Sequence, residues 1–204
     1  MESKFNNSHK LFPLDPESRV KALKTILESR GLVDQETLDN ILDTYQNKVG
    51  PLNGAKLVAK AWVDNNFKKD LLKKTEKVLS DLNIIGRQGE HVKIVENTLQ
   101  THNLVVCTLC SCYPWTLLGL PPAWYKSDAY RSRAVREPRK VLEDFNLEIP
   151  TEKSLKVWDS TSEMRYLVLP QQPENSIGLP ESELVNWVTR DSMIGTGLPK
   201  QPGN

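Results

Sequence analysis

Three cysteines within six residues constrain this chain more than any other feature of its sequence. Cys107, Cys110 and Cys112 are the only cysteines among its 204 residues. An odd number at this close spacing cannot form a disulfide framework, so the thiols indicate a metal or redox site. The apolar run just before them, Leu104 to Val106, has strand character, which places the cysteines where a strand ends.

Charge and hydropathy exclude several classes of protein. Lys and Arg number 27 against 26 Asp and Glu, a net charge of +1, so no bulk field draws the chain to nucleic acid or an anionic membrane. No apolar run approaches the roughly 18 residues of a spanning helix, and residues 1–15 lack a signal-peptide stretch. We therefore expect a cytoplasmic protein that binds neither nucleic acid nor membrane. Its 13 prolines interrupt a thin core, which suggests a partner.

The hydrophobic periodicity changes near Gly86. Before it, apolar residues recur at helical spacing in four segments, which start near Asp15, Asp34, Asn53 and Asn66. After it, strand patterns occur at 92–94, 104–106, 155–158 and 166–169, and helical spacing returns at 181–188. We predict an α+β fold: a helical arm, residues 1–85, followed by a layered α/β domain, residues 86–204, with the metal site. Whether the arm embraces another subunit or packs on its own domain stays open at this point.

A basic stretch lies between Tyr113 and Phe145, which we expect to be irregular. Six basic residues fall between Lys126 and Lys140, with aromatic residues among them, a mixture that RNA-binding surfaces use. The neutral chain and the lack of a nucleic-acid motif favour a solvated face or an interface instead.

Three kinds of site compete for the cysteines. A structural zinc site needs four ligands, and the fourth could only be a histidine such as His102, which lies beyond a short strand. A redox pair of the C-x-x-C type needs a helix directly after it, and Tyr113-Pro114 disfavours one. The third possibility is a compact metal claw.

The claw follows from chelate geometry. If the amides of Ser111 and Cys112 lose their protons, the sulfur of Cys110, both nitrogens and the sulfur of Cys112 close three fused rings around one ion. The thiolate of Cys107 can then bind axially, and one position stays open for catalysis. Such strong donors suit low-spin cobalt(III) or iron(III) better than zinc.

Several short segments at and around the claw share one further resemblance. The relevant runs are 106–115, 118–122, 50–51, 54–56, 61–62, 88–90, 130–133, 136–139, 157–160 and 188–195. In order and spacing, residues 16–196 resemble nitrile hydratase alpha subunits. Thr108, where iron-type members carry Ser, is similar to the cobalt type.

The resemblance implies an enzyme that hydrates nitriles to amides at one cobalt(III) per alpha subunit, iron(III) being the less favoured metal. Cys107 would be the axial ligand, while Cys110 and Cys112 would be oxidised to sulfinic and sulfenic acid. Arginines from a beta subunit would bind their oxygens, in a heterodimer or heterotetramer, and an accessory protein would load the metal. Metal-bound water, free water and the Cys112 sulfenate all remain open as the nucleophile.

Other positions carry roles implied by the same resemblance. Gln88 would bond near the metal, and Trp115 would form an aromatic wall beside the substrate. Asp159, Glu163 and Arg165 would form a polar network behind the claw. Each position also has an ordinary structural explanation. Gln88 could be a loop amide, Trp115 a core residue, and the three charged residues a surface cluster. The rival functions are the metal-bearing subunit of thiocyanate hydrolase, which tends to have Arg at the position of Trp115, and a non-catalytic metal or redox protein.

Overall fold

A computed structural model describes residues 16–43, 51–84 and 91–203. The chain divides into two compact units, residues 1–44 and 45–204. The described residues of the first unit form the helices α1 (Pro16–Ser29) and α2 (Gln35–Asp43). The Thr37 amide donates to the Asp34 carboxylate at 2.8 Å, so Asp34 caps α2 as predicted.

In the described part of the second unit, four strands lie at the predicted places. They are β1 (His91–Glu96), β2 (Thr101–Val106), β3 (Ser154–Asp159) and β4 (Met164–Leu169). β1 pairs in parallel with β4, and β2 in parallel with β3. Parallel neighbours need a long crossover, and the cysteine loop opens the crossover from β2 to β3.

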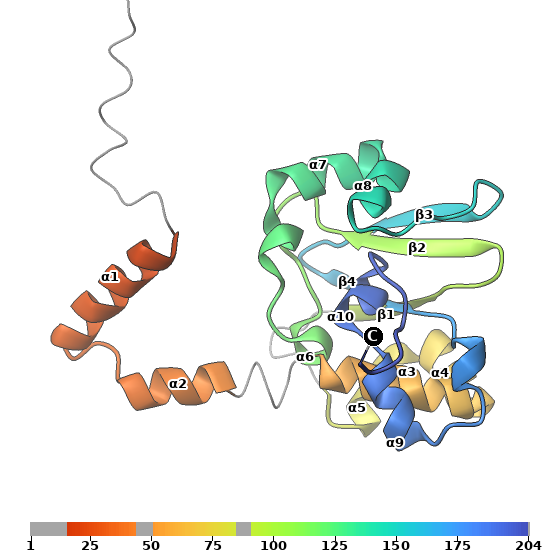
Figure 1. The fold of residues 1–204 in the computed structure, drawn as a ribbon. Helices are drawn as coiled ribbons and strands as arrows, with labels where there is room; N and C mark the ends of the chain where they lie inside the picture. Colours follow the sequence, from red (N-terminus) through yellow and green to blue (C-terminus); the bar gives the residue numbers. More distant parts are fainter. Residues whose placement is uncertain (1–15, 44–50, 85–90, 204) are drawn as a thin grey trace, which may run out of the picture. The chain divides into compact units, whose positions relative to one another are not determined.

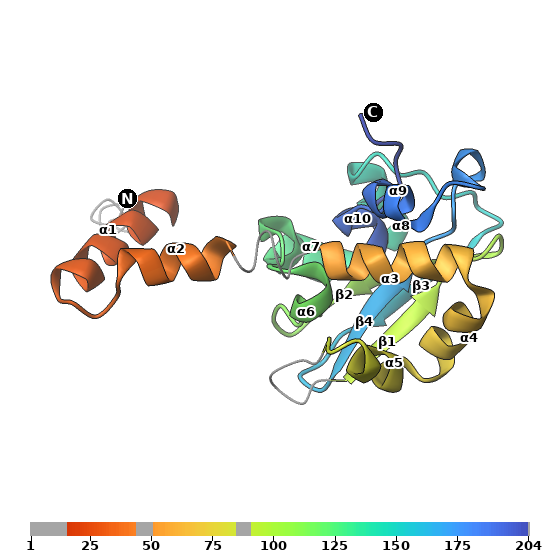
Figure 2. The same cartoon turned by 90° about the horizontal axis from the view of Figure 1, so that it is seen from below.

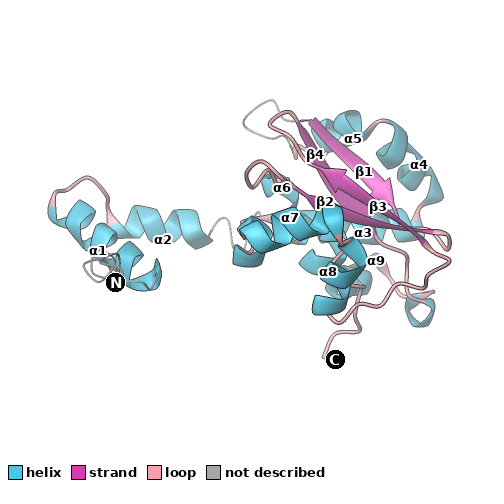
Figure 3. Ribbon diagram, turned by 90° about the horizontal axis from the view of Figure 1, so that it is seen from above, coloured by secondary structure: helices cyan, strands magenta, loops and turns pink. Residues whose placement is uncertain are grey.

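Helices cover both outer sides of the two sheets. On one side α7 (Asp128–Arg136) and α8 (Pro138–Asp144) contact β2 and β3, as Figures 1 and 3 show. On the other side lie α3 (Leu52–Val63), α4 (Asn65–Lys73) and α5 (Thr75–Asp81), of which α4 and α5 contact β1 (Figure 2). This helix–sheet–sheet–helix layering confirms the predicted α+β fold.

Short helices fill the remaining connections. They are α6 (Trp115–Leu118), η3 (Ala123–Lys126), η4 (Glu174–Ser176), α9 (Glu181–Leu184), η5 (Val185–Trp187) and α10 (Arg190–Ile194). α6 and α9 contact α3, and α10 contacts β4. α10 ends at Gly195, whose φ is +95°. A Cβ there would lie 2.0 Å from the Asn103 oxygen, so only glycine allows this approach to β2.

Three local expectations differ from the structure. The helix predicted from Asn66 is two helices that meet at Lys74, and Asp64 caps the first of them. The stretch 113–145 was expected to be irregular, which is wrong: Ser127 caps α7, and a proline opens α8. Asn53, which we expected to precede the third helix, lies inside α3, and its side chain donates to the Thr116 oxygen at 3.0 Å.

The predicted boundary at residue 86 separates helices that the structure keeps with the strands. α3, α4 and α5 belong to the same compact unit as β1 to β4. A role of residues 1–85 in wrapping a partner stays a prediction. Among the helices of the described ranges, none combines the length and the apolar character needed to cross a bilayer.

Candidate metal centre

The pairing of β2 with β3 positions the cysteine loop. Val106, the last residue of β2, is in register with Asp159, the last residue of β3, and the Ser160 amide donates to the Val106 oxygen at 2.7 Å. Cys107 follows directly. The loop therefore leaves the sheet at the carboxyl ends of two parallel strands, the edge where ligand sites occur in such sheets.

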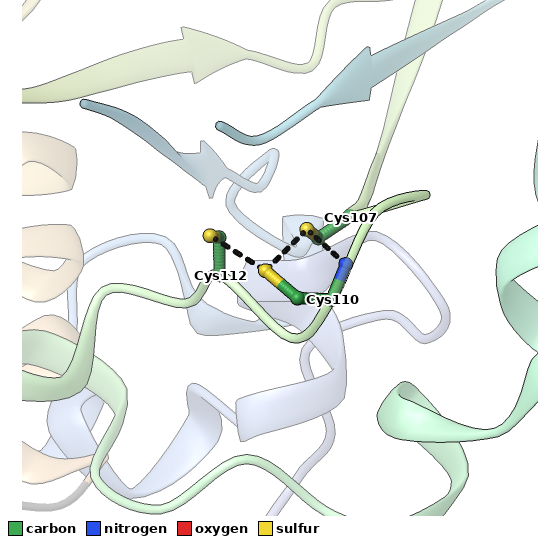
Figure 4. A group of neighbouring side chains, drawn as sticks. All are labelled: Cys107, Cys110 and Cys112. Atoms are coloured by element: carbon green, nitrogen blue, oxygen red, sulfur yellow. Dashed lines mark hydrogen bonds between the residues drawn. The ribbon is translucent and has the colours of Figure 1, made fainter. Parts of the chain in front are cut away.

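The three thiols point toward one another (Figure 4). The Cys110 sulfur lies 3.5 Å from that of Cys107 and 3.1 Å from that of Cys112, and all three sulfurs lie within 4.8 Å of one another. Cys107 is buried, Cys112 is partly exposed and Cys110 is exposed. The structure thus brings together the three predicted sulfur ligands at a point that solvent can reach.

The backbone amides of Ser111 and Cys112, the other two predicted donors, act on the Cys110 sulfur. Hydrogen bonds, first from the Cys112 thiol and then from the Cys107 thiol and the amides of Ser111 and Cys112, together lower the pKa of Cys110 to about 7 against the effect of burial. Burial raises the pKa of Cys112 to about 12. The three cysteine thiols and the amide nitrogens of Ser111 and Cys112 are together a donor set that fits a low-spin trivalent ion.

Asp159 anchors the cysteine loop at Thr108, the residue that follows Cys107. Its carboxylate accepts the Thr108 amide at 2.9 Å and the Thr108 hydroxyl at 2.6 Å. Both bonds involve an ionised acceptor and are therefore among the stronger hydrogen bonds of a protein. Asp159 thus acts on the loop backbone.

Arg131 is a second anchor, and we did not single it out from the sequence. Its Nη2 donates to the oxygens of Thr108 and Leu109, each at 2.8 Å. The neighbouring Tyr130 hydroxyl donates to the Val105 oxygen at 2.6 Å and fixes α7 against β2. Arg131 was one of six basic residues in its stretch, and no local pattern separated it from the rest.

The other arginines of the basic stretch also bond within the chain. Arg133 pairs with Asp144 at 2.6 Å, and Arg139 donates to four backbone oxygens between 149 and 153. Arg136 donates to Ser132. These contacts account for the stretch as a set of intramolecular anchors.

Arg165 and Glu163 take different places. Arg165 is buried, donates to the Thr161 oxygen, and its charge favours the thiolate of Cys112 against the effect of burial. Glu163 is exposed, and its backbone oxygen accepts the His91 amide at 2.7 Å.

Trp115 opens α6 beside the loop and is 42% exposed, so it is no core tryptophan in this chain. Gln88 lies outside the described residues.

Two tyrosines that the sequence reading passed over support the loop. The Tyr125 hydroxyl donates to the Cys112 oxygen at 3.0 Å. Tyr113 packs edge-on against Tyr125 with 5.1 Å between ring centroids. Burial raises the pKa of both phenols, so both hydroxyls stay protonated.

His102, weighed as a fourth zinc ligand, has other partners. Its Nε2 lies 2.7 Å from the Gly195 oxygen and its Nδ1 lies 3.3 Å from the Asn97 amide nitrogen. Asn97 in turn accepts the Asn103 amide at 2.8 Å. His102 therefore belongs to a buried network between β2 and α10, and the zinc alternative loses its candidate ligand.

The comparisons decide the family. The sequence profile described as nitrile hydratase, alpha chain, matches residues 14–197. The chain belongs to the nitrile hydratase alpha-chain family. This confirms the predicted family and its enzyme class.

Individual members of the nitrile hydratase family agree with this assignment. The cobalt-containing nitrile hydratase subunit alpha of Pseudonocardia thermophila is 53% identical over 179 residues, 87% of this chain and 88% of that one. An Fe-type nitrile hydratase structure from Comamonas testosteroni Ni1 aligns with a TM-score of 0.80 at 38% identity and covers 91% of each chain. Thiocyanate hydrolase subunit gamma of Thiobacillus thioparus is 36% identical, with 89% of this chain and 79% of that one covered.

Proposed function

We propose that this chain is the metal-bearing alpha subunit of a cobalt-type nitrile hydratase, which converts nitriles to amides together with a beta subunit. The observation that carries the proposal is the convergence of the Cys107, Cys110 and Cys112 sulfurs within 4.8 Å of one another in a nitrile hydratase alpha chain. The donor set favours a low-spin trivalent ion over zinc, and the cobalt-containing relatives favour cobalt as that ion.

The residues that would hold the metal are Cys107, Cys110, Ser111 and Cys112, one ion per chain. When bound, cobalt(III) would supply Lewis-acid chemistry toward the nitrile. Iron(III) is the alternative, because an Fe-type nitrile hydratase is among the structural relatives. Oxidation of Cys110 to sulfinic acid and of Cys112 to sulfenic acid would add acceptors for the beta subunit's donors.

The surrounding residues orient the loop and the substrate. Asp159 holds the Thr108 amide and hydroxyl, and Arg165 places a positive charge beside Cys112. Trp115, exposed at the start of α6, offers an apolar face to the substrate. Gln88 would bond near the metal, and Glu163, an exposed residue just before β4, would add a polar group to the network of Asp159 and Arg165.

The partner and the arm form one proposal. Residues 1–85 would wrap the beta subunit in a heterodimer or heterotetramer, since the apolar stripe of α1 is exposed, with Val20 at 65% and Leu23 at 58%. A separate accessory protein would load the metal, and the complex would work in the cytoplasm.

The test is co-expression with a nitrile hydratase beta subunit, followed by assays with a nitrile panel and with thiocyanate. We expect amide formation and negligible thiocyanate hydrolysis. A Trp115→Arg variant should lose nitrile turnover more than a Trp115→Phe variant, since Phe keeps an apolar ring. Preferential thiocyanate hydrolysis by the wild-type complex would instead establish the second candidate, to which the relative from Thiobacillus thioparus points.

A further inference from the structure

Two hydrogen bonds joined by one peptide group run from α7 to the Cys107 thiol. Arg131 Nη2 donates to the Leu109 oxygen at 2.8 Å, and Leu109 shares its peptide group with the amide of Cys110. That amide donates to the Cys107 sulfur at 3.3 Å. The guanidinium charge is thus linked to Cys107 through a single peptide group.

The linkage has an electrical consequence. A cation at a carbonyl oxygen polarises the peptide and makes its N–H a stronger donor, because connected hydrogen bonds reinforce one another. A stronger N–H donor at a metal-binding sulfur withdraws electron density from it. Arg131 therefore lowers the strength of the Cys107 sulfur as an electron donor to a bound metal.

The position of Arg131 is built for this contact. The Tyr130 hydroxyl donates to the oxygen of Val105, which lies two residues before Cys107. This bond fixes α7 against β2 and thereby positions Arg131 beside the loop. The Arg131 side chain is only 22% exposed. Its Nε is buried without a hydrogen-bond acceptor among the described residues, a cost that folding alone would not favour.

We propose that Arg131 is a positioning residue that holds the Leu109–Cys110 peptide so that its N–H donates to the axial Cys107 thiolate and tunes the bound metal. This proposal rests on the proposed function, because it presumes that Cys107 is a metal ligand. It adds a determinant from this chain's own α7 to the donors supplied by the partner.

The test compares Arg131→Met and Arg131→Lys with Arg133→Met in the alpha–beta complex. Arg133 lies on the same helix but pairs with Asp144, so its loss is a matched control for helix charge. The first readout is hydrogen exchange of the Cys110 amide in the metal-free complex. The second is the sulfur-to-metal charge-transfer absorption of the cobalt-loaded complex, with the rate of metal loss to a chelator.

We expect Arg131→Met to speed Cys110 amide exchange by about five-fold or more, the worth of one hydrogen bond. The absorption band should move to longer wavelength, because the Cys107 sulfur regains electron density. Metal loss should accelerate by about 10-fold or more, because the loop that carries the ligands is held less firmly. Arg131→Lys should give exchange and metal-loss rates between those of Arg131→Met and wild type, since Lys keeps the charge but not the planar guanidinium that bonds both carbonyl oxygens. Arg133→Met should match wild type.

Wild-type exchange and absorption in Arg131→Met, or equal changes in Arg133→Met, would overturn the proposal. If Arg131→Met does not accumulate, Arg131→Lys decides by the same two readouts. If the wild-type complex takes up no cobalt, the proposed function fails, while amide exchange in the metal-free complex still decides whether Arg131 holds the peptide.

Discussion

The Asp159 carboxylate accepts both hydrogens that Thr108 offers, the amide at 2.9 Å and the hydroxyl at 2.6 Å. The two residues are 51 positions apart in the sequence, and the parallel pairing of β2 with β3 brings them together. The strand pairing thereby fixes the first peptide of the metal loop.

Loss of this double contact should weaken the metal centre. Asp159→Asn replaces the ionised acceptor and leaves one carbonyl oxygen for two donors, so we expect metal content and kcat/KM to fall by about 10-fold or more. Thr108→Val removes only the hydroxyl bond and should cost less, while Thr108→Ser should match wild type. Metal analysis and kinetics of the alpha–beta complex measure this. A larger loss in Thr108→Val than in Asp159→Asn would contradict the account.

Gly195 should tolerate no side chain. A Cβ would meet the Asn103 oxygen at 2.0 Å, and φ is +95°. We expect Gly195→Ala to lower the free energy of unfolding by about 3 kcal/mol or more, because a clash adds to the backbone strain. Gly178 is the matched control: its φ is +89°, with nothing within 4 Å of a Cβ. Gly178→Ala should cost only about 1 kcal/mol. Equal costs by denaturant unfolding would mean that the clash is relieved.

His102 should make stability depend on pH. Burial lowers its pKa in the folded chain below the ordinary value of 6.5, so the unfolded chain takes up this proton first as pH falls. The contribution of neutral His102 to stability is therefore present above about pH 6.5 and is lost below it. We expect the free energy of unfolding to fall between pH 7.5 and 5.5, values about one unit either side of that midpoint, and to fall less in His102→Gln. Parallel slopes in the two proteins would refute this.

The metal-free thiols should differ in reactivity. The pKa of Cys110 is about 7 and that of Cys112 about 12, and only a thiolate reacts rapidly with iodoacetamide. At neutral pH we expect Cys110 to be labelled first, as peptide mass spectrometry can resolve. Cys112→Ala removes the bond that lowers the Cys110 pKa most, so labelling should then require higher pH. Faster labelling of Cys112 in the wild-type chain would contradict this.

The sequence predicted the strands and the loop better than their neighbours. Apolar runs such as Leu104 to Val106 mark strands locally, and three close cysteines mark a site, so both were accessible from the sequence. Arg131 was not, because a guanidinium that bonds two loop carbonyls leaves no pattern in the sequence that separates it from Arg133. The boundary at residue 86 followed a change of periodicity, which does not reveal that α5 packs on β1.

The most direct test of the account is native mass spectrometry of the purified alpha–beta complex, with fragmentation of the alpha chain. We predict the added mass of one cobalt and three oxygens per alpha chain, with two oxygens on Cys110, one on Cys112 and none on Cys107. An alpha chain that carries zinc and three unmodified thiols would contradict the central claim.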